Sequence, residues 1–242
     1  MLKALTASIY SVAFPQSCKV CGDLVEDLED GVVCRTCWQA THIFDGREIL
    51  CSKCGAVLGK LGGPRDVSCH KCGDQHYDKA SAVGIYEQGI AASCLHLKIA
   101  PELSKFVTRS IKDALDRNPI ASETLVIPVP LSPKRRLERG FNQAETIAEV
   151  VARHTGCPLD SHSLVRTRHT PMHRVAMDRR ARELTVEKAF DVVRPKFIAG
   201  RDVLLVDDIF TSGSTVSACA KVLKKNGAAR VDVFTLARAT VK

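Results

Sequence analysis

The sequence predicts an α/β protein with a Rossmann-like parallel sheet, preceded by a small domain built around metal-binding cysteines. Four C-x-x-C pairs fall within residues 18–72, and apolar runs near residues 125 and 204 are each followed by a helical pattern. A third run at residues 230–236 completes a β-α-β unit. We expect a cysteine-rich domain over residues 1–80 and an α/β domain over residues 81–242.

The opening segment Met1–Phe14 is mildly apolar. Its pattern predicts an amphipathic helix packed on the body, with one face formed by Leu2, Leu5, Ile9 and Val12. A secretory signal peptide is the weaker alternative, because the segment has one basic residue and no small-residue cleavage site. No run of 18 apolar residues occurs, so we expect no membrane span and a cytoplasmic protein.

Eight of the 11 cysteines form the four pairs Cys18/Cys21, Cys34/Cys37, Cys51/Cys54 and Cys69/Cys72. A C-x-x-C turn places two sulfurs on one side of a tight knuckle, and two knuckles complete a tetrahedron with Zn–S bonds of about 2.3 Å. Intervals of 12 residues within the first half and 14 within the second suit zinc ribbons, in which each knuckle caps a hairpin. We therefore predict two structural zinc ions with four thiolates each.

Other uses of these cysteines are a disulfide framework, iron–sulfur ligation and redox chemistry, all less suited to four such pairs in a cytoplasmic chain. The pairs could combine in sequential order or interleave, and the sequence leaves both open. Glycines after the second cysteine, at Gly22, Gly55 and Gly73, predict a positive φ in the knuckles. The isolated Cys94, Cys157 and Cys219 are expected to be buried small hydrophobes.

Charge is concentrated in the second part of the chain. Residues 1–80 hold 9 Lys or Arg and 10 Asp or Glu, so 26 of the 35 basic and 17 of the 27 acidic residues fall in 81–242, a net charge of +9. This excess favours an anionic partner, either a phosphorylated metabolite or a nucleic acid. A solvated basic surface without a partner is the alternative.

A buried strand is predicted at Thr124–Pro130, followed by a cationic stretch and a helix from Ala144 to about His154. The stretch contains Lys134, Arg135, Arg136 and Arg139, which could meet a pyrophosphate or simply cover a surface helix. Residues 163–190 are rich in Arg and His with weak apolar periodicity, which is typical of a cationic flap that closes over an anionic ligand. An exposed basic hairpin without a role is the alternative there.

The most informative stretch begins with a buried strand, Val203–Val206, followed directly by Asp207 and Asp208. A helix is predicted from Val216 to the glycine at residue 227, and a second strand at Arg230–Leu236. Between the acids and the helix lies a loop of small polar residues: Thr211, Ser212, Gly213, Ser214 and Thr215. In α/β proteins such a loop, at the carboxyl end of a parallel strand, is where ligands bind.

The loop offers five backbone N–H groups and four hydroxyls at a helix N-terminus, which is a phosphate cradle. Two adjacent carboxylates are unsuited to phosphate but can accept hydrogen bonds from a sugar diol. A ribose 5-phosphate satisfies both halves of the segment. The alternative is a plain strand that ends in an acidic turn.

The segment from Val203 to Thr215 resembles the phosphoribosyl pyrophosphate (PRPP) signature of type I phosphoribosyltransferases. The resemblance implies that Asp207 and Asp208 bind the ribose 2′ and 3′ hydroxyls and that residues 211–215 bind the 5′-phosphate. With the cysteine pairs, Tyr86, Leu97-Lys98 and the stretch "IPVPLSPKRRLERGFNQA", the chain resembles the ComF family. That family joins a double zinc ribbon to a type I phosphoribosyltransferase-like domain.

The resemblance implies a flap that includes Arg168, Thr170, His173 and Arg182. Family members usually carry Gln and Asn where this chain has His173 and Thr185, which affects the expected flap contacts. The leading hypothesis is phosphoribosyl transfer from PRPP with Mg²⁺ to an unknown acceptor. Arg135, Arg136, Arg139 and Lys98 would then stabilise pyrophosphate.

The competing hypothesis, also implied by the resemblance, is a non-enzymatic protein that handles single-stranded DNA during natural competence. Its partners would be a competence helicase or the uptake machinery, and its PRPP site would be regulatory. Aromatic residues make up only 5% of the chain, which argues against an extensive base-stacking surface.

Overall fold

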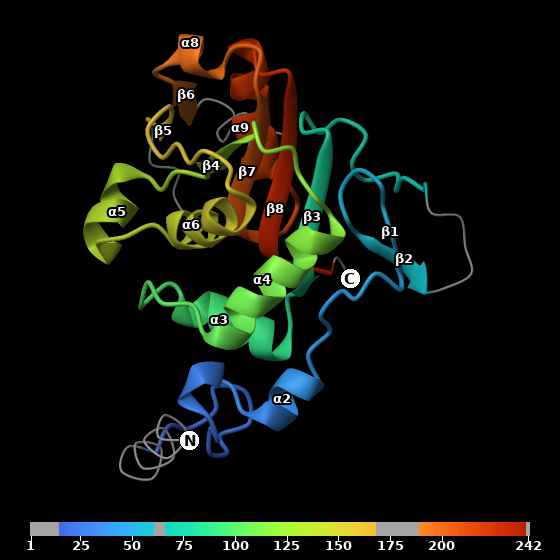
Figure 1. The fold of residues 1–242 in the computed structure, drawn as a ribbon, viewed down its shortest axis with the longest axis vertical. Coiled ribbons are helices and arrows are strands. Elements are labelled where there is room, and N and C mark those ends of the chain that lie inside the picture. Colours follow the sequence, from blue (N-terminus) through green and yellow to red (C-terminus); the bar gives the residue numbers. More distant parts are fainter. Residues whose placement is uncertain (1–14, 61–65, 168–188, 241–242) are drawn as a thin grey trace, which may run out of the picture.

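The structure, a computed structural model, describes residues 15–60, 66–167 and 189–240. Its centre is a sheet of four parallel strands (Figure 1). In spatial order these are β3 (Lys79–Ile85), β8 (Arg230–Arg238), β7 (Asp202–Phe210) and β4 (Leu125–Pro128). The predicted parallel α/β sheet is confirmed, whereas the helix predicted for Met1–Phe14 lies outside the described residues.

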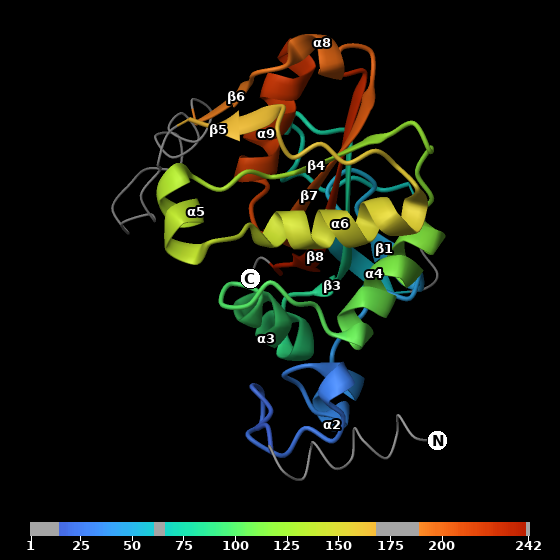
Figure 2. The ribbon, with the colours of Figure 1, turned by 60° about the vertical axis from the view of Figure 1, so that its left-hand side comes forward.

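Helices cover both faces of this sheet, which explains why its central strands are continuously apolar. Val203 and Leu205 share a buried core with α9 (Ser214–Lys225). Leu204 and Val206, which point to the opposite face, share a second core with the helices α4 (Lys105–Arg117) and α6 (Gln143–Thr155). Figure 2 shows α4 and α6 on one side of the sheet and α9 on the other.

The remaining elements surround this frame. Next to the sheet lie α3 (Gln88–His96), α5 (Pro133–Arg139) and α8 (Pro195–Ile198), and β5 (Leu164–Arg166) pairs antiparallel with β6 (Phe190–Val192). The predicted helix after the cationic stretch is confirmed as α6: the Asn142 side chain accepts from the Ala144 N–H at 3.2 Å, and Gly156 ends the helix at φ +74°.

The cysteine-rich segment contains η1 (Leu28–Asp30), α2 (Arg35–Gln39) and an antiparallel hairpin of β1 (Glu48–Leu50) and β2 (Val57–Lys60). The knuckle 51–54 caps that hairpin, as expected. The expectation is wrong for the knuckle that begins at Cys34, because this residue is instead the N-cap of α2. The glycines after the first knuckle of each half have the predicted positive φ, at +86° and +66°, whereas Gly73 does not.

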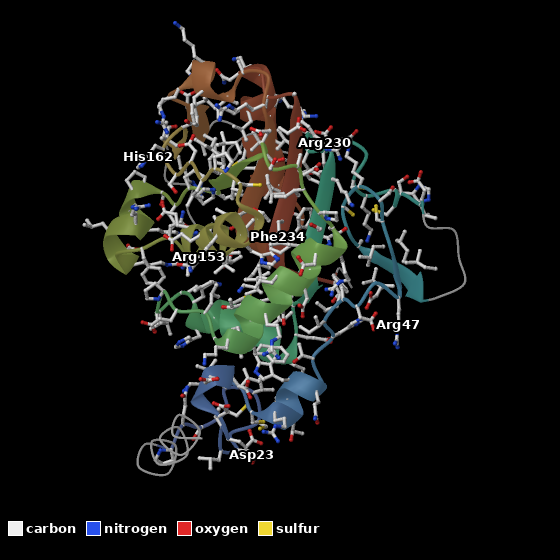
Figure 3. The ribbon with its side chains drawn as sticks, viewed as in Figure 1. Asp23, Arg47, Arg153, His162, Arg230 and Phe234 are labelled. Carbon is white, nitrogen blue, oxygen red and sulfur yellow. The ribbon has the colours of Figure 1, made fainter. Side chains whose placement is uncertain are left out.

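The two halves of the cysteine-rich segment lie at different places on the molecule. Figure 3 shows Asp23 of the first half beyond α3, and Arg47 beside the β1–β2 hairpin of the second half. The second half is attached to the sheet through β3, since the Ala80 N–H donates to the Lys53 carbonyl oxygen at 2.7 Å. The division into domains at residue 80 stays a prediction, because β3 itself begins at Lys79.

Candidate functional site

The two adjacent acids lie inside β7 rather than after it. The strand continues to Phe210 because Asp207, Ile209 and Phe210 pair with β8. Both Asp207 and Asp208 are half-buried, and the Asp208 N–H donates to the Asp207 carboxylate at 2.9 Å. The strand therefore delivers two neighbouring carboxylates to the carboxyl edge of the parallel sheet, the edge at which α/β proteins bind ligands.

Asp207 has an unusual environment for a carboxylate. Burial raises its pKa well above the usual value, and repulsion from Asp208 raises it further. Arg166 of β5 is the cation whose charge opposes this rise. Sequence reasoning placed Arg166 among the flap arginines but not among the site residues. The high arginine content of that stretch was the sequence feature that could have identified Arg166 as a site residue.

Two buried cysteines flank the acids from opposite sides. Cys219 of α9 lies near Asp207, and the Cys94 thiol of α3 donates to the Asp208 backbone oxygen at 3.9 Å. Both thiols are fully buried, as the sequence predicted, and burial raises the pKa of each. They are apolar walls of the site rather than nucleophiles, because a thiol must ionise to attack.

The loop after β7 turns into α9 at Gly213, whose φ is +80°. A β-carbon at this position would lie 2.7 Å from Phe210 Cζ, so the turn requires glycine. Ser212 Oγ and Ser214 Oγ are 2.8 Å apart, and the side chains of Thr211 and Ser212 are exposed. The loop thus presents hydroxyls and N–H groups at the start of a 12-residue helix, an arrangement that suits an anion.

The predicted cations are placed differently with respect to the acids. Arg135 lies close enough to Arg166 for the two charges to repel, which puts it on the Asp207 side. The Arg136 guanidinium instead donates to Glu145 at 2.8 Å on the helix surface. Arg139 is the half-buried last residue of α5.

Lys98 follows α3, where its side chain is half-buried and its charge acts on the Cys94 thiol beside Asp208. The flap residues Arg168, Thr170, His173 and Arg182 lie outside the described residues. The two ends of the predicted flap segment 163–190 form a short antiparallel pair in which Arg166 is opposite Phe190. Arg166 Cζ lies 5.2 Å from the centroid of the Phe190 ring.

The eight paired cysteines form two clusters in sequential order, and the interleaved alternative is wrong. The first cluster joins Cys18, Cys21, Cys34 and Cys37, and the second joins Cys51, Cys54, Cys69 and Cys72. Sulfurs within a cluster lie 3.5–3.7 Å apart where they contact. A tetrahedral zinc site with bonds of about 2.3 Å requires about 3.8 Å, so the geometry fits.

Backbone donors also suit thiolate ligands. The N–H groups of Cys54 and Cys69 donate to Cys51 Sγ at 3.4 and 3.2 Å. Burial alone would raise the pKa of Cys51, but these hydrogen bonds outweigh it and lower the pKa to about 6. Cys18 has the equivalent position in the first cluster, where N–H donors likewise overcome burial and lower its pKa to about 6. Both clusters therefore fit Zn²⁺ in donor type and spacing.

Comparison with known proteins agrees with this two-part organisation. Residues 9–73 match the double zinc ribbon domain family, and residues 142–242 match the phosphoribosyl transferase domain family. The chain is 29% identical to the DNA utilization protein YhgH of Escherichia coli strain K12 over 214 residues, 85% of this chain and 90% of that protein.

Two further relatives are competence proteins. Competence protein F of Haemophilus influenzae is 27% identical over 224 residues, 85% of this chain and 96% of that protein. Competence protein ComFC of Bacillus subtilis is 34% identical over 115 residues, 47% of this chain and 44% of that protein. Within the described residues, no helix is both long and apolar enough to cross a membrane.

Proposed function

We propose that this chain, which belongs to the ComF/YhgH family of proteins with a double zinc ribbon and a phosphoribosyltransferase domain, binds PRPP with Mg²⁺ and transfers its phosphoribosyl group. The observation that carries the proposal is the twin-acid strand end followed by a hydroxyl-rich loop at a helix N-terminus. Asp207 and Asp208 accept hydrogen bonds from the ribose 2′ and 3′ hydroxyls, and residues 211–215 hold the 5′-phosphate.

In the transfer, the bond between C1′ and the pyrophosphate oxygen breaks as an acceptor nucleophile attacks C1′. Positive charge develops on the ribose ring and negative charge on the leaving pyrophosphate. Arg135 lies on the Asp207 side and Lys98 lies near the Cys94 thiol beside Asp208. Together with Arg139 they neutralise the leaving group, whereas Arg136 contributes less because Glu145 holds it. Bound together with PRPP, Mg²⁺ would supply positive charge that stabilises the leaving pyrophosphate.

Two zinc ions hold the cysteine-rich segment together. Each cluster supplies four protein ligands and so leaves no open position for water, which makes both sites structural rather than catalytic. The segment is short and rich in Gly and charged residues, so metal binding contributes directly to its folding free energy. Metal analysis of the purified chain should give two zinc atoms per molecule.

Gly213→Ala should weaken PRPP binding about tenfold, because a β-carbon would lie 2.7 Å from Phe210 Cζ and displace the loop, at a cost near 1.4 kcal/mol. The measurement is isothermal titration with PRPP and Mg²⁺. Gly200→Ala is the matched control, since its φ is also positive, at +75°, and a β-carbon there meets nothing within 4 Å. Binding of PRPP that is equal in all three proteins, or absent from the wild type, would overturn the proposal.

A second candidate function is binding of single-stranded DNA, which the names of the relatives and the charge of +9 in residues 81–242 favour. If it is correct, affinity for a labelled oligonucleotide should fall steeply with salt, because backbone contacts release counterions. Arg135→Gln should reduce the salt slope by about one unit. Binding that does not change between low and high salt would exclude this function.

A further inference from the structure

The last residue of β8, Arg238, lies between the second cysteine cluster and the phosphate loop 211–215. Its Nη1 donates to the carbonyl oxygens of Thr211 at 2.9 Å and Phe210 at 3.5 Å, and its Nη2 donates to Cys54 Sγ at 3.6 Å. The guanidinium carbon is 4.1 Å from the centroid of the Phe210 ring. Arg238 is only 7% exposed, so one buried cation joins a metal-ligand sulfur to the backbone that opens the loop.

The chain segment that follows the second cluster packs under the same loop. The His76 N–H donates to Ser217 Oγ in the first turn of α9 at 3.0 Å. The Tyr77 ring meets the Phe210 ring edge-on at 5.7 Å. Gln75 Oε1 is buried and lies 3.2 Å from the point that a β-carbon at residue 213 would occupy. The second cluster, Phe210 and the loop are therefore one packed unit.

The first cluster belongs to a different part of the core. Three of its four cysteines (Cys18, Cys34 and Cys37) pack with α3 and α4, on the opposite face of the sheet from the core that contains Phe210 and the second cluster. Trp38, which directly follows Cys37, stacks on Phe106 of α4 with ring centroids 4.1 Å apart. Because it is the only tryptophan of the chain, its fluorescence reports on the first cluster alone.

We propose that Arg238 is a positioning residue that couples zinc binding at the second cluster to phosphate binding at loop 211–215, while the first cluster is uncoupled from the loop. Four thiolates around Zn²⁺ leave a net negative charge, which balances the buried guanidinium. Without this charge the buried cation is strongly destabilised and leaves its position. The Thr211 carbonyl oxygen then loses the guanidinium donor, the Phe210 carbonyl oxygen keeps only the Ala239 N–H, and the loop loosens.

Coupling between two sites is reciprocal, so phosphate binding must also hold the second zinc more tightly. We expect release of zinc to a chromogenic chelator to occur in two phases of one ion each. The phase that accompanies the change in Trp38 fluorescence belongs to the first cluster. PRPP with Mg²⁺ should slow the other phase about tenfold and leave the first-cluster phase unchanged. Equal protection of both phases, or of neither, would overturn the proposal if PRPP binds.

Arg238→Met should still bind two zinc ions. Its affinity for PRPP should be about tenfold weaker, and PRPP should no longer slow release of the second zinc. Arg238→Lys keeps the positive charge but lacks the planar set of guanidinium N–H donors, so PRPP should slow release of the second zinc only in part. If the methionine variant does not fold, the lysine variant provides the test. Arg230→Gln is the matched control, since Arg230 lies at the other end of β8 and pairs with Asp232 on the surface. Protection that persists in both Arg238 variants would contradict the role of this residue.

The identity of the loop ligand as PRPP rests on the proposed function. A second measurement therefore tests the coupling through Arg238 independently of PRPP binding. Amide hydrogen exchange of the zinc-loaded proteins without ligand should be faster at residues 211–216 in Arg238→Met than in wild type, with exchange in α4 unchanged. If PRPP fails to bind the wild type but this difference is found, phosphoribosyl transfer fails and the coupling stands. Unchanged exchange at the loop would overturn the coupling whatever the ligand.

Discussion

The Asp207→Asn/Asp208→Asn variant should lose at least about 100-fold in affinity for PRPP with Mg²⁺. In the proposed function each carboxylate accepts a charge-assisted hydrogen bond from a ribose hydroxyl, worth about 1.5–3 kcal/mol, and two such losses exceed the roughly 2.7 kcal/mol that corresponds to 100-fold. Isothermal titration measures the change. The control variant Asp113→Asn/Asp202→Asn removes the same charge from two exposed positions outside the site. Equal heats from the site variant and the wild type would show that the acids do not bind the sugar.

The same substitution should make the ligand-free protein more stable. Burial and repulsion from Asp208 raise the pKa of Asp207, so holding its carboxylate ionised at neutral pH costs folding free energy. Asparagine removes that cost, and we expect a rise of about 0.5–2 kcal/mol in the free energy of unfolding, or about 2–4 °C in Tm for each kcal/mol. A gain in stability with a loss of binding is typical of a functional site.

The pH dependence follows from the same raised pKa. Between the ordinary pKa of an aspartate and the raised pKa of Asp207, the folded wild type binds more protons than the unfolded chain. Its free energy of unfolding should therefore fall as pH rises through this window, and the fall should be absent from the variant. Affinity for PRPP should rise over the same window, since the ionised carboxylate is the better hydrogen-bond acceptor. Urea denaturation and titration at several pH values test both trends.

The sequence was sufficient for the parallel sheet, the small-residue loop before α9 and the cysteine pairs because each has a local signature. It placed the end of β7 too early, at Val206, because aspartate is rare in strands. Pairing of Asp207 with Thr235 and of Phe210 with Arg238 extends the strand, and that register is a long-range property. The sequential grouping of the cysteines likewise depends on how the two halves pack, which spacing alone does not fix.

Arg238 is the clearest case of a residue that sequence reasoning could not find. It is 27 residues after Thr211 and two residues beyond Leu236, where the sequence predicted that the strand ends. Its role follows only from the register that sets it beside Phe210 and from the docking of the second cysteine cluster against that strand end. Arg166, by contrast, lies in a stretch whose arginine content already indicated an anionic neighbour.

Trp38→Ala should cause the largest loss of stability among single substitutions in the cysteine-rich segment. The ring is 5% exposed, stacks on Phe106 and donates from Nε1 to the Asp30 carbonyl oxygen at 3.1 Å. Removing such a buried side chain costs about 3–5 kcal/mol, because a cavity remains where the ring packed. For a chain of this size we expect Tm to fall by about 10 °C.

Trp38→Phe is the matched control, because it keeps an aromatic ring against Phe106 and loses only the hydrogen bond to Asp30. Its Tm should therefore fall by about a third as much as the Tm of the alanine variant. Gly89 of α3 explains why the site is sensitive: a β-carbon there would lie 2.6 Å from Trp38 Cε3, so the helix and the ring are in direct contact. Because Cys34 of the first cluster is the N-cap of α2 and Cys37 lies within this helix, Trp38→Ala should also speed zinc release from the first cluster. An alanine variant with wild-type Tm and release rate would mean that the first cluster is held to α3 and α4 by other contacts.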